Sequence, residues 1–106
     1  MKRAYSYTKV NKREKRKNPN SIQEQKTAIK KYCDDNGIEL AETFDDFLPP
    51  HKYGLDQLLT RCRQVDRPNF VIVTNTDRMT KDDFELGIIE DLLNKKGVKL
   101  IALNEL

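Results

Sequence analysis

Phe70-Val71-Ile72-Val73-Thr74 is a continuous run of aromatic and β-branched residues, and the turn-forming Arg67-Pro68-Asn69 comes directly before it. A run without polar alternation is typical of a strand that helices cover on both faces, as in a parallel sheet. Residues 70–74 therefore predict a buried strand inside an α/β domain.

Short β-rich segments alternate with helical patterns on both sides of this run. The sequence predicts strands over residues 4–10, 38–44, 70–74 and 98–103, and three helices that begin near Ser21, Leu55 and Thr80. Such alternation is the pattern of βαβ units. We therefore expect residues 1–106 to form one doubly wound α/β domain, with a mainly parallel four-stranded sheet and about three helices.

Local patterns predict the helix ends and the apolar faces. Ser21 and Glu24 have the spacing of a capping box, and Thr80 is expected to cap the last helix. Asn36-Gly37 and Gly97 are expected to end helices. The residues expected on apolar faces are Ile22, Ala28, Ile29, Tyr32 and Cys33 in the first helix, Leu55, Leu58, Leu59 and Cys62 in the second, Phe84, Ile88, Ile89, Leu92 and Leu93 in the third, and Ile38, Leu40 and Phe44 in the second strand.

Two polar segments are expected to be loops. Residues 12–20 are strongly basic and end in Asn-Pro-Asn, and residues 45–53 contain Pro49-Pro50 and show no periodicity. In the second segment, Asp45, Asp46 and His51 lack the further ligands that a metal site needs. We expect these three side chains to be solvated.

The composition favours a small cytoplasmic domain that needs no cofactor. Of its 106 residues 35% are charged, and the net charge of +3 does not by itself indicate a nucleic-acid-binding protein. No apolar run approaches the roughly 18 residues of a membrane helix, and the basic N-terminus lacks the apolar region of a secretory signal. Cys33 and Cys62 fall on apolar helix faces, so we expect buried reduced thiols rather than a disulfide or a metal site.

Two polar segments are expected at the same edge of the sheet. Lys9-Val10-Asn11 ends the first strand, and residues 75–81 follow the strand at 70–74. Ligands of open α/β sheets bind at the carboxyl ends of the strands, so these segments are where a phosphate site would lie. Any α/β domain also keeps loops at this edge.

These two segments resemble motifs of the serine site-specific recombinases, the resolvase/invertase and large serine integrase family. Residues 7–11, Tyr-Thr-Lys-Val-Asn, are similar to Tyr-x-Arg-Val-Ser, and residues 75–81, Asn-Thr-Asp-Arg-Met-Thr-Lys, to Leu-Asp-Arg-Leu-Ser-Arg. Further similarities, in the same order, are the ten-residue step from Asn11 to Ser21, the aromatic-x-Asp pattern in 42–46, Lys52-Tyr53-Gly54-Leu55 in place of Arg-Pro-Gly-Leu, and residues 94–101. The resemblance covers nearly the whole chain and implies the fold of a recombinase catalytic domain.

The resemblance also implies a reaction for which this chain lacks the main groups. In the family, a serine hydroxyl attacks the DNA phosphodiester to give a 5′-phosphoserine link, and arginine forks stabilise the phosphate charge. Asn11 stands at the serine position, and an amide nitrogen has no usable lone pair for attack. Lysine keeps the charge but loses the fork of arginine. The family positions at which this chain differs are Lys9, Asn11, Lys52 and Lys81, and those at which it agrees are Asp77 and Arg78; we expect none of these six residues to be catalytic. Gln25 is also retained. Lys15 stands near a usual glutamine, and Leu48-Pro49-Pro50 replaces a common Ser-Gly pair.

Basic side chains near this edge are candidates for contact with the DNA backbone. Each phosphate contact would release counterions, so binding would weaken as the salt concentration rises. The candidate DNA-binding residues are Lys9, Lys12, Arg13, Lys15, Arg16, Lys17, Arg78 and Lys81. The alternatives are a solvated, mobile loop over residues 12–17, and a structural ion pair at Asp77-Arg78.

Three functions remain open from the sequence. The first is a recombinase-like domain that no longer cuts DNA and acts as a DNA-associated accessory or regulator of recombination, with an intact recombinase or itself as partner. The second is a protein-interaction module without a nucleic-acid role. The third is an active DNA-cleaving enzyme with another nucleophile, although Ser6 and Thr8 do not match the loop position. Because the last strand ends close to Leu106, we expect neither a dimerisation helix nor a separate DNA-binding domain.

Overall fold

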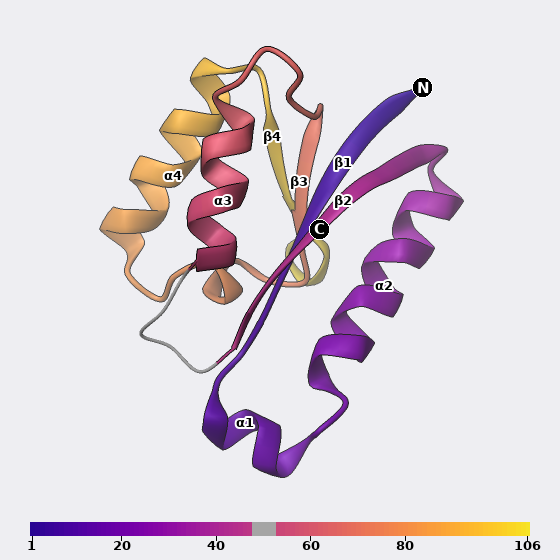
Figure 1. The fold of residues 1–106 in the computed structure, drawn as a ribbon, viewed down its shortest axis with the longest axis vertical. Helices are drawn as coiled ribbons and strands as arrows, with labels where there is room; N and C mark the ends of the chain where they lie inside the picture. The colour runs from indigo at the N-terminus through magenta and orange to yellow at the C-terminus, as the bar shows by residue number, and fades with distance from the viewer. Residues whose placement is uncertain (48–52) are drawn as a thin grey trace.

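Four parallel strands form the sheet at the centre of the domain (Figure 1). This computed structural model describes residues 1–47 and 53–106. The elements in chain order are β1 (Lys2–Val10), α1 (Lys12–Lys17), α2 (Ser21–Asp35), β2 (Ile38–Phe47), α3 (Tyr53–Cys62), β3 (Phe70–Val73), the 3-10 helix η1 (Thr76–Arg78), α4 (Asp83–Lys95), β4 (Lys99–Ala102) and the 3-10 helix η2 (Leu103–Glu105). The strand order is β2-β1-β3-β4 and every pairing is parallel. The predicted doubly wound α/β fold is confirmed.

Helices cover both faces of this sheet. α2 lies on one face, and α3 and α4 lie on the other (Figure 1). Along β3, Ile72 packs with the α2 residues, whereas Val71 and Val73 pack with α3 and α4. Because β3 contributes to both cores, its sequence carries no polar alternation.

A β-bulge changes which face β2 presents. Ala4 pairs with Leu40, but the next residue, Tyr5, pairs with Glu42, so Ala41 is an extra residue in β2. An extra residue shifts the later side chains to the opposite face. Leu40 therefore packs in the core beside α2, and Phe44 packs in the core beside α3 and α4. The prediction that these two residues share one face was wrong.

Parts of both predicted loops are regular structure. Residues 12–17 form α1, because the Asn11 side chain caps the helix and lets the basic segment close a turn. Residues 45–47 continue β2 and pair with residues 8–10 of β1. Residues 48–52, which include His51, Lys52 and the Leu48-Pro49-Pro50 stretch, lie outside the described residues.

Two predicted helix caps were wrong. The Ser21 hydroxyl donates a hydrogen bond to Glu14 instead of capping α2, so no capping box forms. The cap of α4 is Asp82, whose side chain accepts a hydrogen bond from the Phe84 N–H. Thr80 instead accepts a hydrogen bond from the Asp82 N–H. In both cases the hydroxyl that was expected to cap a helix forms a hydrogen bond with another polar group, Glu14 for Ser21 and the Asp82 N–H for Thr80.

Two glycines end helices as predicted. Gly37 follows α2 and Gly97 comes just after α4, with φ values of 65° and 72°. These left-handed conformations cost glycine little because it has no Cβ.

The predicted apolar faces are only partly buried. In α4, Phe84 is 79% exposed and Ile88 is 53% exposed, although Ile89 and Leu93 are buried. In α2, Ala28 is exposed, contrary to the prediction. In α3 the face is confirmed, with Leu55, Leu58 and Cys62 buried and Leu59 half-buried.

Both cysteines are free thiols in the two cores. Cys33 and Cys62 are buried, as predicted. Burial raises the pKa of the Cys62 thiol to about 11, so this thiol stays protonated at neutral pH. Among the described residues, no helix is both long and apolar enough to span a bilayer.

Candidate functional site

A pocket lies where the chain reverses direction along the sheet. From β1 the chain moves outward to β2, and it then returns across the sheet to β3 on the other side of β1. Loops that leave the carboxyl ends of β1 and β3 therefore diverge, which is the usual position of a ligand site in such sheets. A cavity of about 220 Å³ opens there, and its lining residues are Lys9, Asn11, Glu14, Asn75, Asp77, Arg78 and Lys81.

The structure thus brings together five of the six site positions that the sequence resemblance indicated. Lys9 and Asn11 come from the end of β1, and Asp77, Arg78 and Lys81 come from η1 and the segment after it. The sixth, Lys52, is outside the described residues. Glu14 was not among the predicted site residues.

Asn11 has a structural partner in this pocket. Its backbone is extended (φ −94°, ψ 169°), and its Oδ1 accepts a hydrogen bond of 2.8 Å from the Glu14 N–H. This is the geometry of a helix N-cap, a position that asparagine and serine both favour. Asn11 therefore starts α1.

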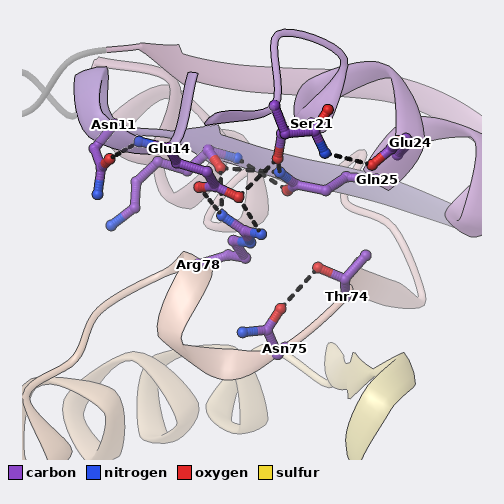
Figure 2. A network of polar contacts seen from close by, with 10 residues as sticks. Asn11, Glu14, Ser21, Glu24, Gln25, Thr74, Asn75 and Arg78 are labelled. Carbon is purple, nitrogen blue, oxygen red and sulfur yellow. Dashed lines mark hydrogen bonds and ion pairs between the residues drawn. The ribbon is translucent and has the colours of Figure 1, made fainter. Parts of the chain in front are cut away.

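Arg78 forms a two-point ion pair with Glu14 (Figure 2). Its Nη1 donates to Glu14 Oε1 at 2.6 Å, and its Nη2 donates to Oε2 at 2.9 Å. Nη1 also donates to the Lys9 backbone carbonyl at 3.0 Å. The expected alternative of a structural ion pair is realised at Arg78, but its partner is Glu14 rather than Asp77, which is exposed.

The charge on Glu14 is stabilised by these contacts. The hydrogen bonds from Arg78 lower the pKa of the Glu14 carboxyl below its ordinary value, and the bond from Ser21 acts in the same direction, while burial opposes them. Because the folded-state pKa is lowered, the ion pair contributes stability above the pKa of the unfolded chain and loses it as the pH falls through the folded-state pKa.

A second layer of hydrogen bonds holds Glu14 and the end of β1. The Ser21 hydroxyl donates to Glu14 Oε2 at 2.8 Å, and Gln25 donates to the Ser21 oxygen at 3.2 Å. The Gln25 amide also contacts both backbone polar groups of Lys9, donating to its carbonyl at 3.0 Å and accepting from its N–H at 3.2 Å. Figure 2 shows these side chains meeting between α1, the start of α2 and η1.

The basic residues of α1 are all exposed. Glu14 is the only residue of α1 that is partly buried. Lys15 Nζ lies 4.7 Å from the centre of the Phe47 ring, a cation–π contact that holds this lysine against β2. The exposed basic residues of α1 are Lys12, Arg13, Lys15, Arg16 and Lys17.

Asp46 belongs to the joint between β2 and α3 and not to a solvated loop. It is only 5% exposed, and it accepts hydrogen bonds from the Tyr7 hydroxyl (2.6 Å) and from the N–H groups of Gly54 (2.7 Å) and Leu55 (3.0 Å). Burial, and next the hydrogen bond to Asp46, raise the pKa of the Tyr7 hydroxyl.

Asp45, its neighbour, was also wrongly expected to be solvated. It accepts a hydrogen bond from the Thr8 hydroxyl and forms an ion pair of 2.9 Å with Lys26. The aromatic-x-Asp pattern was the signal in the sequence that could have indicated that these aspartates belong to ordered structure rather than to a solvated loop. Within residues 1–47 and 53–106, no group of three or more histidine, cysteine or acidic residues could hold a metal ion.

Comparisons with known proteins agree with this fold. The family model described as "Resolvase, N terminal domain" matches residues 4–106. A search of curated protein sequences finds no match to the chain.

Several solved structures have the same fold. A resolvase family site-specific recombinase from Streptococcus pneumoniae has a TM-score of 0.87 and 18% identity, over 99% of this chain and 74% of that chain. The N-terminal catalytic domain of TP901-1 integrase has a TM-score of 0.84 and 22% identity, over 98% and 78%. The catalytic domain of ISC1926 TnpA, an IS607-like serine recombinase, has a TM-score of 0.81 and 24% identity, over 95% and 67%.

The match to the family model extends over almost the entire chain, and the likeness to these structures extends over the whole sheet and its helices. The chain therefore belongs to the resolvase family, and its residues 4–106 form a serine-recombinase-like catalytic domain.

Proposed function

We propose that this chain is a recombinase-like domain that binds the DNA backbone without cutting it, as an accessory or regulator of recombination. The observation that carries the proposal is the side chain of Asn11. It stands at the position of the family's serine, and its amide oxygen is engaged in capping α1. An amide nitrogen has no nucleophilic lone pair, so this position supplies no attacking group.

The cationic groups of the pocket also suit binding better than catalysis. Lys9 and Lys81 offer point charges at positions where the family uses arginine forks, and a lysine cannot make the two parallel hydrogen bonds that such a fork makes. The guanidinium of Arg78 is already paired with Glu14. Stabilisation of a pentavalent phosphate would need these forks to be available.

The surface for DNA is the exposed basic side of α1. Five of the six residues of α1 are lysine or arginine and all five are exposed, while the sixth, Glu14, lines the pocket. A cluster of basic side chains on one short helix suits contact with neighbouring phosphates. The proposed partner is DNA. An intact recombinase or a second copy of this chain would meet the protein on the same DNA. We place this activity in the cytoplasm, the compartment that two reduced thiols fit.

Removal of three of these charges is expected to weaken DNA binding. A Lys15→Ala, Arg16→Ala, Lys17→Ala triple variant loses phosphate contacts, so its affinity for a short nonspecific duplex should fall at least about tenfold at low salt. Alanine is a good helix former, so α1 should persist. Fluorescence anisotropy at low and at physiological salt measures both the affinity and its salt dependence.

The matched control removes the same charge elsewhere. Lys95, Lys96 and Lys99 are exposed and lie at the end of α4 and the start of β4. Their triple alanine variant should bind nearly as tightly as the wild type. If the two triple variants lose the same affinity, α1 is not the DNA surface. No wild-type binding at low salt would remove the DNA role and favour a protein-interaction module, for which the exposed Phe84 and Ile88 offer a surface.

Restoring a serine is not expected to restore cleavage. In Asn11→Ser the hydroxyl would still cap α1, Lys9 and Lys81 would still lack the arginine fork, and Arg78 would still hold Glu14. Incubation with supercoiled and linear duplex, followed by denaturing electrophoresis, detects a covalent protein–DNA species. Neither the wild type nor Asn11→Ser should form one. A 5′-phosphoserine adduct in the variant, or any covalent adduct in the wild type, would contradict the proposal.

A further inference from the structure

The guanidinium of Arg78 already holds an anion, and that anion is part of the same chain. We propose that Glu14 is an internal competitor for phosphate: its carboxylate occupies the Arg78 fork and withholds this arginine from DNA. The inference rests on the proposed function, because it concerns the phosphate that would otherwise reach the same pocket. It adds that one acidic residue limits the affinity of the site.

The geometry of the pair is that of a bound oxyanion. Two parallel hydrogen bonds of 2.6 and 2.9 Å join the two Nη atoms of Arg78 to the two Glu14 oxygens. A phosphate would present two oxygens to the same edge of the guanidinium, so the carboxylate and the phosphate cannot both be bound there. Nη1 also holds the Lys9 carbonyl, and Nε is buried without an acceptor among the described residues. No second edge of the fork is therefore open to the pocket.

The position of Glu14 is fixed by the start of α1. Asn11 caps the helix through the Glu14 N–H, and this contact sets the direction in which the Glu14 side chain leaves the helix. The Ser21 hydroxyl then holds Oε2 from the opposite side. The same short helix thus directs one carboxylate inward and its basic side chains outward.

The charge balance of the pocket follows from this arrangement. Its lining has three cationic side chains, Lys9, Arg78 and Lys81, and two anionic ones, Glu14 and Asp77. The strongest phosphate ligand of the three, Arg78, is the one that Glu14 holds. Positive charge is consequently available on the outer side of α1, while the pocket itself is close to neutral.

A purely structural role and a competitor role for Glu14 predict changes of opposite sign in the affinity for DNA. If Glu14 only anchors α1 to η1, its replacement would loosen the basic helix and weaken DNA binding. If Glu14 competes with phosphate, its replacement frees Arg78 and strengthens binding. The sign of the change in affinity separates the two roles.

The test compares Glu14→Gln with Asp77→Asn on the same nonspecific duplex. Both substitutions remove one negative charge from the pocket, but Asp77 has no hydrogen bond to Arg78 in the described structure, so its loss does not release the fork. We expect Glu14→Gln to bind about fivefold more tightly than the wild type, with a salt dependence steeper by about one phosphate contact. Asp77→Asn should gain clearly less. The double variant Glu14→Gln, Arg78→Ala should return to wild-type affinity.

The contrary outcomes are distinct from a failure of the proposed function. Weaker binding by Glu14→Gln, a gain no larger than that of Asp77→Asn, or a gain that survives Arg78→Ala would overturn the competitor role while wild-type binding stands. If the wild type and Glu14→Gln both fail to bind at low salt, the DNA role fails and the competitor role fails with it. Circular dichroism establishes whether each variant is folded.

A second measurement on the wild-type protein keeps the inference testable if Glu14→Gln does not fold. The NMR signal of the Arg78 Nε–H reports directly on this side chain. When inorganic phosphate is added until amide signals of residues 12–17 shift, the Arg78 Nε signal of the wild type should stay unchanged. A shift of this signal in the wild type, of the same size as those of α1, would show that Glu14 does not exclude phosphate.

Discussion

Replacing Asp46 with alanine is expected to destabilise the domain by about 4 kcal/mol, because several buried groups lose one shared acceptor. Asp46 is 5% exposed and accepts hydrogen bonds from the Tyr7 hydroxyl and from the N–H groups of Gly54 and Leu55. The first N–H groups of a helix have no partner within the helix, so both backbone donors of α3 would be left buried without one. Urea unfolding followed by circular dichroism measures the difference in the free energy of unfolding.

The neighbouring Asp45→Ala is the matched control. Asp45 carries the same charge in the same strand, but its partners are the Thr8 hydroxyl and the partly exposed Lys26. Its loss should cost about 1 kcal/mol, the usual magnitude for a partly solvated polar contact. Equal costs at positions 45 and 46 would mean that the joint between β2 and α3 does not depend on the buried carboxylate.

The contacts of Asp46 and Gly54 give a structural reason for the part of the family pattern that these two residues carry. Both belong to motifs through which the sequence resembles the recombinases, and both are needed for one contact, the docking of α3 onto the end of β2. Gln25 similarly holds the backbone of Lys9 at the end of β1. Asp46, Gly54 and Gln25 thus serve contacts inside the fold, and Lys9, Asn11 and Lys81 line the pocket together with Asp77 and Arg78.

The sheet could be predicted because its signals are local. A continuous apolar run predicts a strand buried on both faces, and the alternation of strands and helices predicts parallel order. The bulge at Ala41 could not be predicted in this way. A period-two pattern assumes that no residue is inserted, and the insertion in β2 is visible only against its partner β1.

The site could be predicted only in its position. Parallel strands end at one edge of a sheet, so the meeting of residues 9–11 with residues 75–81 follows from topology. The Glu14–Arg78 pair joins residues 64 positions apart, and no local pattern indicates it. Residues 12–17 looked like a solvated loop because of their charge, although one acidic residue among the basic ones is the group that fixes α1 to the pocket.

Gly54→Ala is expected to destabilise the domain by about 3 kcal/mol, because the new methyl group meets backbone that cannot move aside. A Cβ at this position would overlap the backbone carbonyl oxygen of Asp45 and lie 2.9 Å from its carbonyl carbon and 3.1 Å from Asp46 Oδ1. Relief of this clash requires α3 to move away from β2, which lengthens the hydrogen bonds from Gly54 and Leu55 to Asp46. The free energy of unfolding in urea measures the effect.

Gly87→Ala is the matched control for this substitution. Gly87 lies within α4, and a Cβ there would meet no atom within 4 Å. Because alanine favours the helix more than glycine does, this variant should gain about 0.5 to 1 kcal/mol of stability. The two substitutions add the same atom to a helix and are expected to change stability in opposite directions. A loss below about 1 kcal/mol for Gly54→Ala would mean that α3 can shift at its first turn without breaking the Asp46 contacts.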